Sequence, residues 1–136
     1  MIYINRPDLD KQNLYSKVLQ TIEDISDEYA LQKDFGTMSM AAQEVVDFLL
    51  ENYDLFCVDF SCFIDSDEVG FCFESSEPLF QQLETSPKGV LLSVLSDDLE
   101  YQSDYKQVSF SVHVKPKQSI KRETLYKEVF QQTKTI

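Results

Sequence analysis

The chain has 136 residues, which is the length of a single domain. Hydrophobic residues make up 43% of it, with 10 Phe and 7 Tyr, so the chain can bury a core and is not intrinsically disordered. The formal net charge of −12 disfavours nucleic-acid phosphates and anionic membranes, and we expect neither as a partner. Basic residues gather between positions 115 and 134, whereas segments 24–34 and 97–104 are acidic.

The cysteines and the histidine limit which disulfide and metal sites the chain can form. Cys57, Cys62 and Cys72 lie in apolar, strand-like runs, and their odd number does not suit a fully paired disulfide scaffold. Buried structural thiols in a reducing cytoplasm are the better interpretation. With one histidine and no CxxC spacing, we predict no metal site. No apolar run has the length of a signal peptide or a membrane span, so we expect a cytoplasmic protein.

The first part of the chain reads as a strand followed by two helices. The segment MIYIN alternates and contains β-branched residues, which is typical of a short strand. Pro7 and the aspartates after it favour a helix start, and apolar residues at helical spacing predict a helix over about 8–31. Gly36 is expected to break that helix. A second helix over about 39–52, capped by Thr37 or Ser39, follows.

The middle and the end of the chain alternate between strand and helix patterns. Two apolar-alternating runs around the polar segment DSDE predict an antiparallel hairpin over 55–75. Leucines at helical spacing predict a helix over 90–98, and QVSFSVHV predicts a strand over 107–115 with His113 on the solvent side. We therefore expect an α+β two-layer sandwich, with the helices on one face of a mixed, mainly antiparallel sheet. Residues 1–116 form the domain, and 117–136 form a helical tail.

Three segments carry a resemblance to a known family. They are LYSKVLQTIEDISDEYAL, MSMAAQEVVDFLLENY and KGVLLSVLSDDLEYQSDYKQVSFSVHV. Their order, with the hairpin between them, resembles the histidine-kinase-like (Bergerat) ATPase fold over roughly residues 7–115. The nearest branch is similar to the anti-sigma factor serine/threonine kinases. In that family Glu44 would be the catalytic base, and Asp47, Asn52, Ser75 and Gly89 would lie in the nucleotide-binding positions.

The chain departs from the family pattern where the phosphates would bind. Phe48 stands where the family has its metal-binding asparagine, and a hydrocarbon ring cannot coordinate Mg²⁺. The lid and glycine-box segments read SSEPL and PKG, so Gly89 remains but Pro87 removes a backbone donor. We expect Phe48 to be buried and the pocket beside it to be reduced or filled. If the helix register is shifted by one residue, Asp47 would face the pocket as a substitute ligand.

These departures favour a non-catalytic or weakly nucleotide-binding regulatory domain that binds a protein. By the resemblance, the partner is sigma-factor-like or similar to an anti-sigma antagonist, and a homodimer stays open. An active ATP-dependent serine/threonine kinase, with ATP and Mg²⁺ as cofactors, is the alternative; otherwise we expect no cofactor. A third hypothesis is an unrelated scaffolding domain, in which Glu44 is a solvated carboxylate on a helix face.

Overall fold

A computed structural model describes residues 2–114 of the chain. The elements in chain order are β1 (Ile2–Leu9), α1 (Leu14–Glu28), α2 (Gln32–Asn52), β2 (Val58–Ile64), β3 (Glu68–Glu74), α3 (Pro87–Leu95), β4 (Asp98–Gln102), a short 3-10 turn η1 (Ser103–Tyr105) and β5 (Gln107–His113). The predicted tail over 117–136 lies outside the described residues. Within them, no helix combines the length and the apolarity needed to cross a membrane.

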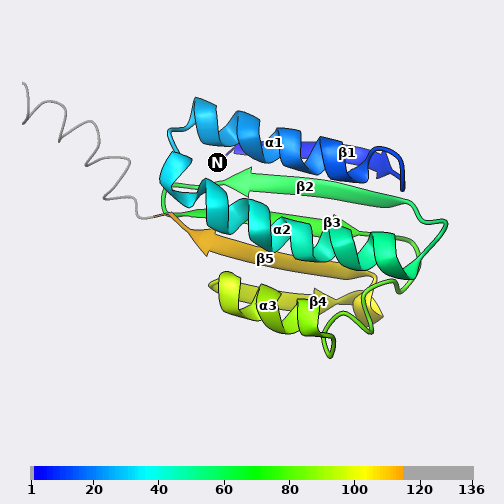
Figure 1. Cartoon of the computed structure of the whole chain (residues 1–136). Coiled ribbons are helices and arrows are strands. Elements are labelled where there is room, and N and C mark those ends of the chain that lie inside the picture. Colours follow the sequence, from blue (N-terminus) through cyan, green and yellow to red (C-terminus); the bar gives the residue numbers. More distant parts are fainter. Residues whose placement is uncertain (1, 115–136) are drawn as a thin grey trace, which may run out of the picture.

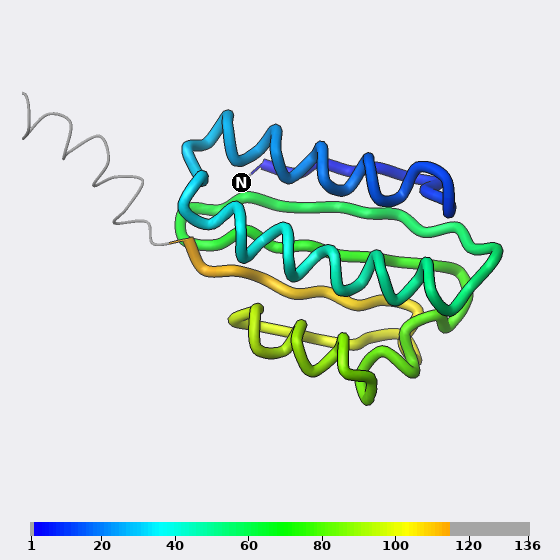
Figure 2. The backbone as a smooth tube through the Cα atoms, viewed as in Figure 1, coloured from blue at the N-terminus to red at the C-terminus, as the bar shows by residue number. Residues whose placement is uncertain are grey.

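The strands form one sheet in the order β1-β2-β3-β5-β4, and all four pairings are antiparallel. Helices α1, α2 and α3 all lie over the same face of this sheet (Figure 1). The chain runs along edge strand β1, passes through the two long helices and only then enters β2 (Figure 2). The predicted α+β two-layer sandwich is confirmed, and the described sheet contains no parallel pair.

The core lies between the helices and one face of the sheet. Four phenylalanine side chains at its centre are almost fully buried and touch one another with ring centroids 4.8–6.3 Å apart: Phe60, Phe71, Phe73 and Phe110. They lie on the strand faces that the alternating pattern predicts as buried. Helix α2 meets them with a stripe that includes Val45 and Leu49, both with 0% exposure.

The predicted start of the first helix at Asp8 is wrong. Strand β1 continues to Leu9 through an irregularity in its pairing with β2, and Asp8 has a φ of 57° there. Its backbone N–H donates to the Asp59 carboxylate over 2.9 Å, which anchors the irregular segment. Pro7 fits because β1 is an edge strand, where a missing N–H breaks no ladder bond.

The predicted break at Gly36, and the caps at Thr37 or Ser39, are also wrong. Helix α2 runs without interruption through these residues. The chain instead turns at Ala30, which has a φ of 57°, and Leu31 precedes the first turn of α2. Alanine rarely adopts this left-handed conformation, so its sequence gives no turn signal, whereas a single glycine inside a helix is tolerated at modest cost.

The third predicted helix extends too far along the chain. Helix α3 ends at Leu95, and Asp98–Gln102 forms edge strand β4. Leu99 and Tyr101 pair with Phe110 and Val108, which places them on the core side of the sheet. Leu99 fits both the helical spacing of the preceding leucines and the alternation of strand β4. The sequence pattern therefore does not show where the helix ends and the strand begins.

We expect Phe71→Ala to lower the free energy of unfolding by about 3–5 kcal/mol, because it leaves a cavity in the ring layer. Chemical denaturation measures this change. Leu55→Ala is the matched control: Leu55 is 89% exposed, so its truncation removes little buried surface. Equal midpoints for the two variants would show that Phe71 is not in the core.

Candidate functional site

Of the residues predicted for the nucleotide site, Asn52 alone lines the hollow beside Phe48 in the described part of the chain. Glu44 and Asp47 are half-buried on α2. Within the described chain, neither carboxylate makes a hydrogen bond or an ion pair. Ser75 lies just after β3, and Gly89 lies in the first turn of α3. Glu44, Asp47 and Ser75 are absent from the residues that line the hollow beside Phe48.

The polar groups of Asn52 and Ser75 are engaged by the backbone. The Asn52 amide donates to the carbonyl of Phe48 over 2.8 Å and so caps the end of its own helix. The Ser75 hydroxyl donates to the carbonyl of Cys57 over 3.1 Å and accepts from the N–H of Glu77. Asn52 therefore has its partner within α2, and Ser75 has its partners in the loops around β3.

The segment PKG is the first turn of α3. Ser86 is the N-cap, and its hydroxyl accepts from the Gly89 N–H over 3.1 Å, while Pro87 occupies the first turn. A Cβ on Gly89 would lie 1.9 Å from the carbonyl oxygen of Leu83. Glycine at 89 thus allows the preceding loop to approach the helix closely, and its N–H is already bonded.

Phe48 is buried, as predicted, with 3% exposure and an edge-on contact to Tyr53. The pocket beside it was predicted to be reduced or filled; it is not filled, because an open hollow of about 390 Å³ remains. Phe48 and Asn52 line it from α2, and Lys88 lines it from α3. The Lys88 ammonium is 3.4 Å from the Glu51 carboxylate, so the cation of this hollow is already paired.

The sheet face away from the helices carries a second hollow of about 410 Å³. The register places Phe63 opposite Gly70, Gly70 opposite Ser111, and Ser111 opposite Asp98. A Cβ on Gly70 would lie 2.0 Å from the Phe63 ring, so glycine lets this ring lie across the neighbouring strand. The small residues of β3 and β5 leave the space for this hollow in the middle of the sheet face. Acidic residues, including Glu68 and Asp98, line the hollow.

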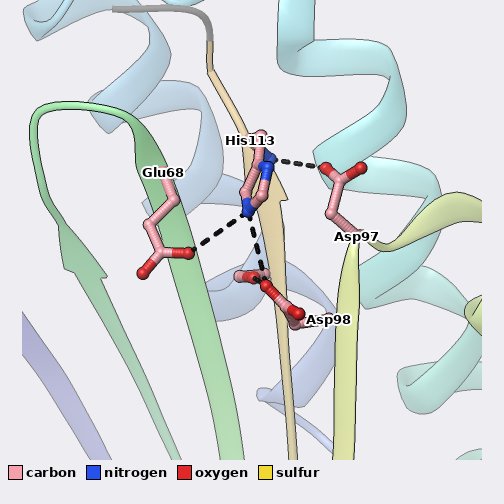
Figure 3. Close-up of polar contacts among 5 residues, drawn as sticks. Glu68, Asp97, Asp98 and His113 are labelled. Carbon is pink, nitrogen blue, oxygen red and sulfur yellow. Dashed lines mark hydrogen bonds and ion pairs between the residues drawn. The ribbon is translucent and has the colours of Figure 1, made fainter.

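At one end of this hollow, two carboxylates flank the imidazole of His113 (Figure 3). His113 Nε2 is 3.4 Å from an Asp98 oxygen and 3.7 Å from a Glu68 oxygen. The possible ligand atoms of the three residues all lie within 4.8 Å of one another. We call Glu68, Asp98 and His113 the carboxylate–histidine cluster.

The cluster is assembled by the ends of three adjacent strands. Glu68 begins β3 and is paired with His113 at the end of β5, and Asp98 begins β4. The buried Ser111 hydroxyl donates to Asp98 over 3.2 Å, and the backbone N–H of His113 donates to Asp97 over 2.6 Å. These bonds fix the strand ends, while the Asp98 and His113 side chains stay 70% and 57% exposed.

Imidazole nitrogen and carboxylate oxygen are ordinary ligands of divalent transition ions. The sequence pattern predicts no metal site, because the chain has one histidine and no CxxC spacing. The same pattern places His113 on the solvent side of its strand. Two features of the sequence could have indicated the cluster: the acidic segment 97–104 and the position of His113 on the solvent side of its strand. Placing Asp98 beside His113 also required strand β4, which was predicted as helix.

The three cysteines are free thiols; of the three predicted as buried, Cys62 is buried, Cys72 is half-buried and Cys57 is exposed. Burial raises the pKa of Cys62 to about 11, and burial followed by the nearby Glu74 charge raises the pKa of Cys72 to about 11. Desolvation and the Asp8 carboxylate also raise the pKa of Cys57. Thiols with raised pKa values are protonated at neutral pH and are poor nucleophiles.

Comparison with known protein families and with curated proteins finds no match for this sequence. Its function is therefore inferred from its own residues and their arrangement.

Two glycine substitutions test the structural role of Gly89. We expect Gly89→Ala to destabilise the fold by about 1–3 kcal/mol, because its Cβ would overlap a backbone carbonyl that has to move. Gly36→Ala is the control: a Cβ there meets nothing within 4 Å inside α2, so we expect stabilisation of about 0.5–1 kcal/mol. Thermal and urea unfolding measure both, and a neutral Gly89→Ala would contradict the close approach.

Proposed function

We propose that this chain is a non-catalytic regulatory domain that works by binding another protein. The observation that carries the proposal is that three hydrogen-bonding groups at or next to the hollow beside Phe48 are already used within the chain. The amide of Asn52, the N–H of Gly89 and the ammonium of Lys88 all have partners. A nucleotide triphosphate needs several free N–H donors and a metal ligand, and it would have to displace these bonds.

An exposed apolar surface on α3 supports the protein-binding part of the proposal. Val90, Leu91 and Val94 are 56%, 50% and 74% exposed and lie on the outer side of the helix; we call them the α3 stripe. Leu92, between them in sequence, is fully buried, so α3 is apolar on both sides. A short helix that presents aliphatic side chains to solvent is typical of a docking surface for a protein partner.

The nature of the partner follows from the family resemblance and from charge. The resemblance implies a sigma-factor-like protein or an anti-sigma antagonist as the partner, and this part is an analogy at the level of the fold. The net charge of −12 favours a partner whose contact surface is basic around an apolar centre. An active kinase would instead need Glu44 beside bound phosphate and metal, and Glu44 does not line the hollow beside Phe48.

We expect isothermal titration with ATP or ADP, each with Mg²⁺, to give no binding heat up to millimolar nucleotide. Phe48→Asn should not create binding, because the new amide supplies one ligand while the Gly89 N–H stays bonded to Ser86. The folded state of the variant is checked by circular dichroism. Micromolar affinity of the wild-type chain for either nucleotide would overturn the non-catalytic proposal.

We expect Val94→Asp to weaken capture of the partner by tenfold or more, because a charge would be desolvated at the centre of the contact. Ser93→Asp is the matched control: it adds the same charge one residue earlier, at an exposed position beside the α3 stripe. Quantitative affinity capture followed by mass spectrometry compares the two. Equal recovery of every captured protein by both variants would remove the α3 stripe as the docking surface.

A further inference from the structure

We propose that the carboxylate–histidine cluster is a binding site for one divalent transition-metal ion of the zinc class. The proposal stands independently of the proposed function: α3 covers one face of the sheet (Figure 1), and strand alternation places the cluster on the other face. It rests on the identity of the three ligands, on the distances between their atoms, and on the way in which the fold holds them.

The distances are longer than a hydrogen bond and are compatible with ligands of one metal ion. A charge-assisted hydrogen bond between imidazole and carboxylate spans about 2.7–2.9 Å. In the cluster, Nε2 of His113 is 3.4 Å from Asp98 and 3.7 Å from Glu68. Two ligand atoms bound at about 2.0–2.1 Å around a tetrahedral ion lie about 3.3 Å apart. The two spacings from His113 are therefore close to those of atoms that share a central ion, and all three ligand atoms lie within 4.8 Å of one another.

The three ligands also select the kind of ion. One imidazole nitrogen and two carboxylate oxygens suit zinc and its neighbours in the transition series, whereas Mg²⁺ and Ca²⁺ prefer oxygen ligands alone. Two carboxylates would balance the charge of a divalent cation, and the acidic chain around them favours cations further. Three protein ligands leave a fourth position for water, which the exposure of Asp98 and His113 makes accessible.

Neighbouring groups hold the ligands without blocking the metal position. Ser111 donates to the Asp98 carboxylate, which leaves that carboxylate oriented toward His113. Direct pairing of Glu68 with His113 in the register of β3 and β5 places their side chains on the same face. Hydrogen-bond partners such as Ser111 orient metal ligands, and their loss commonly weakens metal binding by about 10- to 100-fold.

The histidine offers a direct probe, since it is the only one in the sequence. In proton NMR of the full chain at neutral pH, we expect its imidazole signals to shift on titration with Zn²⁺ and to saturate at one ion per chain. Glu68→Gln and Asp98→Asn should each weaken the apparent affinity by tenfold or more. Glu100→Gln is the matched control: it removes the same charge on the same hollow, outside the cluster, and should leave the affinity unchanged.

The exposed Cys57 thiol can bind zinc on its own, so the imidazole shift, and not total bound zinc, is the readout. Thermal unfolding gives a second measurement: Zn²⁺ should raise the midpoint of the wild type and of Glu100→Gln, and not that of Glu68→Gln. An imidazole that does not respond to millimolar Zn²⁺ would show an ion-pair cluster only and overturn the proposal. An equal response to Mg²⁺, or equal affinities of all three variants, would also overturn it.

Discussion

The layer of phenylalanine rings on one sheet face is the constraint on which the rest of the structure depends. Successive side chains of a strand point to opposite faces, so burying one set of residues under the helices forces their neighbours to the other side. Burial of Phe71, Phe110 and Val112 in this way places Gly70, Ser111 and His113 on the open face. A shift of one residue in β5 would bury the histidine and expose the rings, so the same packing energy that forms the core also positions the carboxylate–histidine cluster.

The sequence predicted those parts of the fold whose pattern had one period over a sufficient length. The hairpin of β2 and β3 and the strand β5 alternate cleanly, and their faces were predicted correctly. The errors occurred where local signals conflicted with tertiary placement. Pro7 is a good first residue of a helix and equally acceptable in an edge strand, and only pairing with β2 decides between them. Ala30 turns the chain without a turn-forming side chain.

The candidate site was less predictable than the fold, for a physical reason. Its three ligands come from the ends of three different strands, and the separations between 68, 98 and 113 have no regular spacing. Their proximity depends on the strand order β3-β5-β4, which no local pattern encodes. The predicted nucleotide site stays a prediction, and local patterns could not show that the amide of Asn52 and the N–H of Gly89 bond within the chain. The relationship to the ATPase family stays a prediction.

The two proposed surfaces are connected by a short piece of chain. Helix α3 ends at Leu95, and Asp98 begins β4 three residues later. Strand β4 is a five-residue edge strand that pairs with β5, and the bonds that hold its start, from Ser111 to Asp98 and from His113 to Asp97, both come from β5. A cation held by Asp98, His113 and Glu68 would tie this start to both β5 and β3. It would thereby restrict the end of the helix that presents the α3 stripe, because two residues cannot absorb much motion between fixed ends.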